Sequence, residues 1–385
     1  MKQFLALLED IYKNGKDRSD RTGVGRRGIF GTRMEFDLAD GFPLVTSRFT
    51  SFKNIKEELL WFISGSYDNN ALKERGINFW RAWEVSRNEV LMKADEDELN
   101  PDSSKFFYPG SIGPMYGYAW RNAPSDFKGR TYQDYIAYFE KHIGSVSDPT
   151  MIDRFAPDIQ RFLLSEQHLI DSTATQTELE SFIAFNRNSF TRGLNERLLE
   201  RLVAYDLTGI DQLWESIKML KSNPYSARNC VTAWIPQWVP YQDKGYARNV
   251  YEGKGVLAPC HAFFQFFVEP DENGRPATVS LMLDQRSSDT GVGAPYNVAS
   301  YSLLLLMAAR EVGLKPGRFV WVGGDTHIYL NQLASVEEHL GRETHELPTV
   351  TIKESANKSI FLITPEDIEL HGYKHSGKLE YPVAS

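Results

Sequence analysis

The chain has 385 residues, of which 42% are apolar and 24% are charged, and this composition is ordinary for a globular protein in water. The net charge of −8 argues against a broad nucleic-acid-binding surface, although it leaves room for a local basic pocket. No apolar run reaches the ~20 residues that a membrane span needs, and no basic leader precedes an apolar stretch. Two cysteines, Cys230 and Cys260, cannot form a disulfide framework, so we expect a reducing cytoplasm.

Three elements are predicted near the N-terminus. Phe4 to Tyr12 has apolar residues at helical spacing. A polar, glycine-containing loop at residues 20–25 follows, and Gly28 to Leu38 then alternates as a strand does. Phe52 to Ile63 forms a second amphipathic helix, and Glu58 falls on its apolar side. A carboxylate in that position requires a partner or a function, because burying an unpaired charge is costly.

The middle of the chain is less regular. Residues 86–111 are polar and acidic with little periodicity, which predicts an insertion or a long loop. Helical patterns at residues 132–143 and 179–202 indicate a small helical subdomain. Residues 209–221 form another amphipathic helix.

The C-terminal part predicts strands. Residues 262–269 and 277–287 form two strands joined by a turn at Pro270 and Gly274. Asn297 to Val312 is a nearly all-apolar helix, which predicts a central, buried position. Residues 317–332 form a further strand that runs into a polar turn. Together these elements predict an α+β domain, with helices over a large mixed sheet.

Cys260 is the first candidate for chemistry. A free cysteine in an apolar stretch is more often structural than catalytic. Pro259 and His261 nevertheless mark a break in regular structure, where a side chain can be presented to a cleft. Arg286 could favour the thiolate, which is the nucleophilic form. The scattered histidines and the two cysteines show no metal-binding spacing, and no glycine-rich nucleotide fingerprint is present.

Several long motifs in the right order resemble the thymidylate synthase family. They are "DRTGVG", "IFGTRMEFDLADGFPLVT", "EELLWFISG", "GPMYGYAWR", "PCHAFFQF", "DQRSSDTGVGAPYNVASYSLLLLMAA", "VWVGGDTHIYLNQ" and the terminal "PVA". The resemblance covers most of residues 1–83, 113–121 and 209–385. It implies a single domain over residues 1–385 with the family's fold. Segments near 84–112, 122–208 (helical) and 235–254 would be insertions.

The resemblance implies a one-carbon transfer from 5,10-methylenetetrahydrofolate to C5 of dUMP. The thiol of Cys260 would add to C6 of uracil, because C5 is a poor nucleophile until that addition makes an enolate. C5 would then attack the methylene carbon, and loss of tetrahydrofolate would leave an exocyclic methylene on the tethered base. The expected partners are dUMP, folate and a second copy of the chain in a homodimer with shared active sites. No metal, membrane or nucleic acid is expected.

The resemblance also assigns residues. Glu58 would manage protons at the uracil O4 and the folate through water, and Tyr116 would help to remove the C5 proton. Asn297 would present an amide to O4 and N3, which suits uracil, whereas Asp there would favour cytosine. The full catalytic set is Cys260, Glu58, Tyr116, Arg286, His261 and Asn297. The nucleotide set is Arg21, Arg228 (reaching from the partner), Arg286, Ser287, Gln285, Asn297, His327 and Tyr329. The folate set is Trp80, Trp83, Leu257, Asp289, Gly293 and Tyr296.

Each assignment has a simpler alternative. Glu58 could be a helix-surface charge, and Asn297 could cap the helix that follows it. His327 and Tyr329 could be the polar end of a strand. Outside the matched motifs, the aromatic and apolar residues of the folate set would simply belong to the core.

The chain departs from the family at three places. Ala227 precedes Arg228 where the family carries two adjacent arginines, and Phe49 follows Arg48 where the family has a second cation. Ser385 ends the chain where the family has a branched apolar residue that helps to seal the site.

A site that excludes water less completely favours capture of the methylene intermediate by water. The product is then 5-hydroxymethyl-dUMP, as in the phage branch of the family. The sequence therefore favours a dUMP hydroxymethylase, which would work in the host cytoplasm if phage-encoded. The alternative is capture by hydride, which gives dTMP and dihydrofolate. Trp80, Leu257 and His261 support this alternative because they match thymidylate synthase. A non-enzymatic RNA-binding or regulatory relative is disfavoured by the intact catalytic set and the acidic charge.

Overall fold

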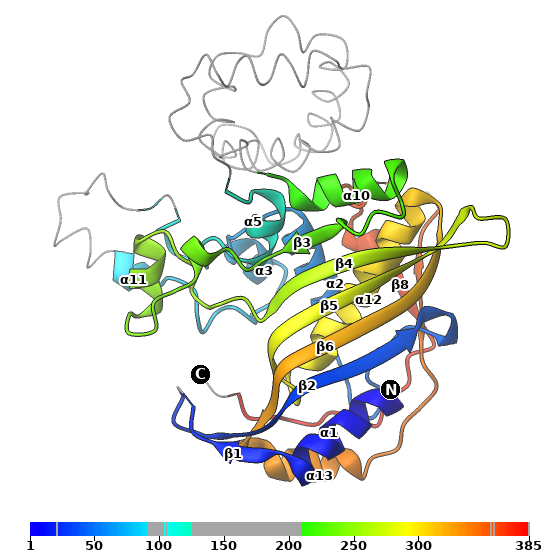
Figure 1. The fold of residues 1–385 in the computed structure, drawn as a ribbon. Coiled ribbons are helices and arrows are strands. Elements are labelled where there is room, and N and C mark those ends of the chain that lie inside the picture. The colour runs from blue at the N-terminus through cyan, green and yellow to red at the C-terminus, as the bar shows by residue number, and fades with distance from the viewer. Residues whose placement is uncertain are drawn as a thin grey trace, which may run out of the picture.

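The computed structural model describes residues 1–20, 22–90, 104, 106–124, 210–354, 356 and 359–383. These residues form an α+β domain around a six-stranded sheet in the order β1-β2-β6-β5-β4-β3 (Figure 1). The strands are β1 (Lys16–Arg18), β2 (Arg26–Asp37), β3 (Cys230–Thr232), β4 (His261–Pro270), β5 (Pro276–Asp289) and β6 (Lys315–Tyr329). Strands β5 and β6 pair in parallel and their neighbours pair antiparallel, so the predicted mixed sheet is confirmed.

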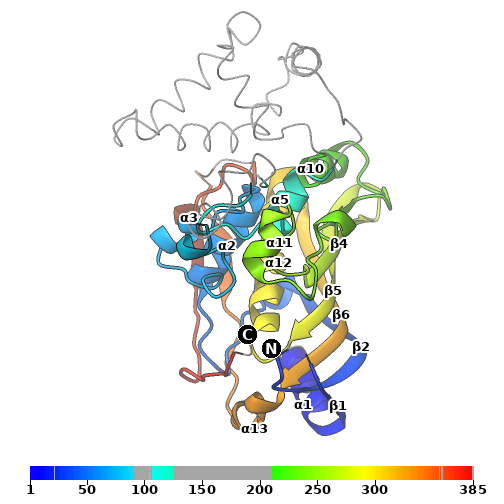
Figure 2. The ribbon, with the colours of Figure 1, turned by 90° about the vertical axis from the view of Figure 1, so that its left-hand side faces the viewer.

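Helices cover one face of this sheet, whereas no described helix covers the outer face of β2, β6, β5 and β4 (Figure 2). The long helix α12 packs on β5 and β6, and α2 packs on α12 and α5. The helices are α1 (Lys2–Asn14), α2 (Phe52–Ile63), α3 (Asn70–Glu74), α5 (Tyr116–Arg121), α10 (Gln212–Ser222), α11 (Tyr246–Tyr251), α12 (Gly293–Val312) and α13 (Leu333–Leu340). A separate two-stranded sheet pairs β7 (Thr349–Ile352) with β8 (Ile368–His371).

Helix α12 is the centre of the hydrophobic core. Its apolar residues run almost all round the helix, and the side chains of Leu303, Leu304 and Leu305 are fully buried. The helix begins at Gly293, four residues earlier than predicted, and the carboxylate of Asp289 accepts a hydrogen bond from the amide of Val292 just ahead of it, at 3.2 Å. Asn297 therefore lies in the second turn, and its interpretation as a helix cap is wrong.

The other predicted elements are confirmed within a few residues. Helices α1 and α2 and strands β2, β4, β5 and β6 lie where the apolar patterns indicate. Asp211 caps α10 by accepting from the amide of Trp214 at 2.9 Å. In the β4–β5 turn, Gly274 adopts a positive φ of 77°, which explains why glycine is used there. The helical patterns at 132–143 and 179–202 lie outside the described residues.

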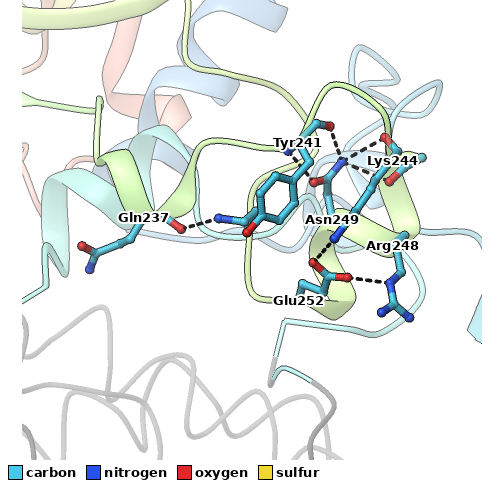
Figure 3. Close-up of polar contacts among 8 residues, drawn as sticks. Gln237, Tyr241, Lys244, Arg248, Asn249 and Glu252 are labelled. Atoms are coloured by element: carbon cyan, nitrogen blue, oxygen red, sulfur yellow. Dashed lines mark hydrogen bonds and ion pairs between the residues drawn. The ribbon is translucent and has the colours of Figure 1, made fainter.

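The predicted insertion at 235–254 forms a compact loop around α11 (Figure 3). Asn249 is buried. Its Oδ1 accepts a hydrogen bond from the backbone amide of Tyr241 at 2.8 Å, and its Nδ2 donates to the carbonyl of Tyr241 at 3.1 Å. The same amide donates to the carbonyl of Lys244 at 3.0 Å. Glu252 pairs with both Lys244 and Arg248. One buried asparagine thus ties the segment before α11 to the helix itself.

Among the described helices, none combines the length and the apolar character that crossing a lipid bilayer would require.

Candidate active site

Cys260 lies at the point where the chain enters β4. Its backbone amide donates to the hydroxyl of Tyr116 at 3.0 Å, which ties the loop to the start of α5. Cys260 keeps part of its surface open to solvent, although its sulfur lies deep enough that burial raises the pKa of the thiol. The positive charge of Arg286 opposes that effect, because its Nη2 lies 3.8 Å from the sulfur. The thiol is therefore held protonated but beside a group that stabilises its anion.

Arg286 is fixed by the loop that carries the cysteine. Its Nε donates to the carbonyl of Pro259 and its Nη2 to the carbonyl of Ala258, both at 2.9 Å. Its backbone amide also donates to the carbonyl of Cys260 at 2.9 Å. A planar guanidinium with several anchored donors has little freedom left, so the cation stays beside the sulfur. The structure thus brings these two predicted residues together.

Tyr116 has the only positive φ among the described non-glycine residues, at 31°. Its ring stacks on His261 with the centroids 3.9 Å apart and an angle of 14° between the planes. Gly117 follows it, and a Cβ there would lie 2.3 Å from the carbonyl oxygen of Phe62 in α2. Close contact between α5 and α2 and the stacked histidine together hold this unfavourable backbone conformation in place. Burial raises the pKa of the tyrosine hydroxyl, which therefore stays protonated.

Glu58 lies on the inner side of α2, as its sequence position predicts. Its carboxylate accepts a hydrogen bond from the indole Nε1 of Trp80 at 2.9 Å. Burial raises its pKa to about 7, and the Trp80 bond opposes this only in part. A carboxyl with that pKa can give or take a proton near neutral pH, which is what a general acid–base needs. Its interpretation as a free surface charge does not fit this environment.

His261 is buried behind Tyr116. Its Nδ1 is 2.8 Å from the hydroxyl of Tyr301, and burial lowers its pKa to about 3. The imidazole is therefore neutral at physiological pH and supports the stacked tyrosine from behind. Its place in the catalytic set stays a prediction.

Asn297 is oriented by a chain of hydrogen bonds. The indole of Trp321 donates to Oε1 of Gln285 at 2.8 Å, which leaves Nε2 of Gln285 as the donor on its other side. That Nε2 donates to Oδ1 of Asn297 at 3.0 Å. Because the indole of Trp321 can only donate, these two hydrogen bonds fix which end of the side-chain amide is oxygen in Gln285 and in Asn297. Asn297 therefore presents a defined face, with its Nδ2 available as a donor.

The strand register brings the predicted nucleotide residues together. Strands β5 and β6 pair Ser287 with Asp325 and Asp289 with His327, and residues paired in this way point to the same side of the sheet. His327 is buried, its ring meets that of Tyr329 edge-on at 5.3 Å, and burial lowers its pKa.

Two members of the nucleotide set, Arg228 and Arg21, are not shown in contact with Ser287 and His327. Arg228 is exposed just ahead of β3, and its backbone contacts are with Ser226 and Cys230. Arg21 lies outside the described residues, as does Ser385.

The predicted folate residues lie between α2, α12 and the C-terminal tail. Trp80 and Trp83 meet edge-on at 6.1 Å, and Tyr296 at the start of α12 meets Phe79 at 5.2 Å. Gly293 begins α12, while Leu257 is half-buried in the loop before Cys260. Burial raises the pKa of Asp289 to about 6, although its oxygens accept hydrogen bonds from Gln332 and from the backbone ahead of α12.

The sequence analysis singled out Arg48 but missed the other residues that hold the C-terminal tail against this site. The hydroxyl of Tyr381 is 2.8 Å from Nδ1 of His339, whose Nε2 is 2.7 Å from the hydroxyl of Ser47. The guanidinium of Arg48 lies over the ring of Tyr381, 5.2 Å from its centroid, and donates to the carbonyl of Gly291 at 2.9 Å. No local pattern could have found this cluster, because its members come from four distant segments.

Gln332 links the tail directly to Asp289. Its Nε2 donates to the carboxylate of Asp289 at 3.0 Å and to the carbonyl of Pro382 at 2.9 Å. A Cβ at Gly291 would lie 2.6 Å from the ring of Tyr381, so the tail packs closely on the loop before α12. The described end of the chain therefore forms one wall of the candidate site.

No cluster of three or more histidine, cysteine, aspartate or glutamate side chains in the described part of the chain is arranged to hold a metal ion.

Comparison with known proteins gives a family match over almost the whole chain. The family model described as thymidylate synthase matches residues 2–385. A thymidylate synthase of Francisella philomiragia is 33% identical over 375 residues, which cover 97% of this chain and 96% of the relative. A thymidylate synthase of Francisella tularensis subsp. holarctica is 32% identical with the same coverage.

The raised pKa of Glu58 predicts a pH-dependent effect of Glu58→Gln. A carboxyl whose pKa rises from 4.5 to about 7 on folding stabilises the fold fully below pH 4.5, and loses that contribution as the pH rises to 7. The amide keeps the acceptor for Trp80 but cannot ionise. We therefore expect the free energy of unfolding of the variant, relative to wild type, to increase by about 3 kcal/mol between pH 4.5 and 7.5. Urea unfolding across this range measures the difference, and Asp289 cancels because both proteins contain it. A difference that does not change with pH would contradict the buried, proton-binding carboxyl.

Proposed function

The chain belongs to the thymidylate synthase family, and from that premise we propose that it converts dUMP to dTMP by one-carbon transfer followed by hydride transfer from the folate. The transfer of a one-carbon unit from 5,10-methylenetetrahydrofolate to dUMP is the activity of the family. The hydride step, the individual residue roles and the dimer are our proposal. The observation that carries the hydride step is the docked C-terminal tail, because that step requires water to be excluded from the methylene intermediate.

The first half of the reaction uses the thiol of Cys260. The sulfur adds to C6 of uracil as Arg286 stabilises the thiolate, and C5 then forms its bond to the folate methylene carbon. Glu58 can donate a proton toward O4 while protonated and can take one back through water after ionising. Tyr116 lies within reach of the cysteine loop, which supports its part in removing the C5 proton. Elimination of tetrahydrofolate breaks its bond to the transferred carbon and leaves an exocyclic methylene on the base.

The second half decides the product. Hydride transfer to the methylene gives a methyl group and dihydrofolate, and the thiolate then leaves C6. The tail contacts of Tyr381, Pro382 and Arg48 support this outcome, since they close the side of the site next to Asp289. They also provide an anchor that does not depend on a cation at position 49. The names of the relatives agree with this outcome.

Water capture is the second candidate, and Phe49 is the observation that favours it. Its ring is 39% exposed and packs on His375, so it supplies no charge to hold the last residues of the chain. The missing charge at this position is the basis for a product of 5-hydroxymethyl-dUMP and free tetrahydrofolate.

A homodimer is supported by the uncovered outer face of the sheet. The strand register puts Phe267, Met282, Val320 and Val322 on this face, and Phe267 is 61% exposed. A second copy that packs its own sheet there would bury these apolar side chains. Arg228 is exposed beside β3, which borders this face, and would reach the partner's nucleotide phosphate.

Product analysis tests the proposed reaction. Purified protein with dUMP and methylenetetrahydrofolate should give dTMP and an equal amount of dihydrofolate, measured by nucleotide mass and by absorbance. Cys260→Ala should abolish turnover and also the mass of the covalent complex with 5-fluoro-dUMP and folate. Cys230→Ala is the matched control, because it removes the other thiol and should leave both intact. Hydroxymethyl-dUMP without dihydrofolate would refute the hydride step, and turnover by Cys260→Ala would refute the nucleophile.

The tail anchor predicts a change of product in Tyr381→Phe. This substitution keeps the ring under Arg48 and removes the hydroxyl that bonds His339, a loss of about 1 kcal/mol of tail docking. The fraction of turnover that ends as 5-hydroxymethyl-dUMP should therefore rise several-fold, as measured by mass of the products. Tyr225→Phe is the control, since that exposed hydroxyl donates to Gly274 at the distant β4–β5 turn. An unchanged product ratio in Tyr381→Phe would show that the hydroxyl does not control water access.

The shared-site dimer predicts complementation between two inactive chains. Arg228→Ala and Cys260→Ala homodimers should both have little activity. A mixture should regain up to about one quarter of wild-type activity, because half of the dimers are heterodimers and each contains one intact site. Separate tags on the two chains allow heterodimers to be purified and assayed. Inactive heterodimers would contradict the sharing of the phosphate site.

A further inference from the structure

Two arginines at the loop end of the β1–β2 hairpin share one carboxylate. Arg18 and Arg26 are paired across the hairpin, and both guanidinium groups contact Asp325 in β6. Nη2 of Arg18 lies 2.7 Å from one carboxylate oxygen, and Nη2 of Arg26 lies 3.0 Å from the other. The side chains of Arg18, Arg26 and Asp325 together therefore carry a net charge of +1. Nε of Arg26 is also buried without an acceptor among the described residues.

An N–H group that is buried without an acceptor is costly, and Arg26 also keeps its positive charge. The side chain of Arg26 is 26% exposed, whereas its Nε atom is buried. These features indicate that an anion completes its environment. The planar fork of an arginine is suited to a phosphate, to which it can donate two parallel hydrogen bonds.

The strand register places Arg26 beside the candidate nucleotide site. Arg26 is paired with Tyr329, and residues paired across a ladder point to the same side of the sheet. Asp325 itself lies 3.4 Å from Nδ1 of His327 and is paired with Ser287 on β5. One carboxylate thus connects Arg26 to the predicted sugar ligand, and the neighbouring strand carries the predicted phosphate ligand Ser287.

We propose that Arg26 is a ligand of the 5′-phosphate of the nucleotide, oriented by Asp325 and supported by Arg18. The inference rests on the proposed function, because it assumes that a nucleotide occupies the site next to Ser287 and His327. The proposal also accounts for Ala227. The family carries two adjacent arginines ahead of β3, and this chain has Ala227 in place of the first of them. An arginine in β2 of the same subunit supplies the missing positive charge.

A purely structural role is the competing explanation, since Arg26 also joins the hairpin to β6 through Asp325. The two roles differ in which ligands they affect. A phosphate ligand matters for dUMP and not for deoxyuridine, which has the same base and sugar but no phosphate. Loss of a structural tie would disturb both ligands alike.

The test compares the affinities of dUMP and deoxyuridine for the full-length protein by calorimetry. Arg26→Gln should weaken dUMP binding about tenfold to a hundredfold, which corresponds to the loss of charge-assisted hydrogen bonds, and should change deoxyuridine binding less than twofold. Arg275→Gln is the matched control, because Arg275 is an exposed arginine in the β4–β5 turn, at the opposite end of β5 from Ser287. It should leave both affinities unchanged.

Equal weakening of both ligands in Arg26→Gln, or no weakening of dUMP, would overturn the proposal. If Arg26→Gln does not fold, Arg26→Lys keeps the charge and tests the same point, with a smaller loss for dUMP alone. A wild-type protein that binds dUMP no more tightly than deoxyuridine would overturn the nucleotide function itself, so the two failures can be told apart.

Discussion

The hydrogen bonds of Arg286 hold the loop that carries Cys260, the candidate nucleophile. Its side chain donates to the carbonyls of Ala258 and Pro259, and its amide donates to the carbonyl of Cys260, each at 2.9 Å. These bonds attach the irregular loop at residues 258–260 to the end of β5, so the sheet holds the loop in place. The same cation lies 3.8 Å from the sulfur, and it favours the thiolate that burial alone would disfavour. Structural and chemical roles are therefore combined in one guanidinium.

Burial sets the protonation states around this thiol. Removal from water disfavours every charged form, so it raises the pKa of Glu58 to about 7 and of Asp289 to about 6, and lowers that of His261 to about 3. Each of the two acids can thus gain or lose a proton near neutral pH. The histidine stays neutral and serves as a stacking partner for Tyr116. One physical effect, burial, thus raises the pKa of the acids and lowers the pKa of the histidine. The tail lies close to one of these acids, because Gln332 donates both to Asp289 and to the carbonyl of Pro382.

Much of the architecture follows from local sequence. The apolar spacing of α1, α2 and α12 and the alternation in β2, β4, β5 and β6 are properties of short segments, and these elements lie where the spacing indicates. Glu58 could be singled out because a charged residue on an apolar helix face is recognisable without any tertiary information. Cys260 and Arg286 could be paired because both lie within motifs that resemble one family. Helix α12 begins four residues before the apolar pattern indicates, because its first turn, from Gly293 to Tyr296, does not share that pattern.

The sequence by itself determined the family, four of the six strands of the sheet and, through its motifs, the candidate site residues. Only the tertiary structure decided which side chains meet across long separations: Ser47, His339 and Tyr381 at the tail, and Arg26 with Asp325 at the hairpin. It also decided the direction and size of the pKa shifts, because these depend on burial by segments that are remote in the chain. Local patterns record which face of an element is apolar. They do not record which partner will cover that face, and hydrogen bonds and charges in the site depend on that partner.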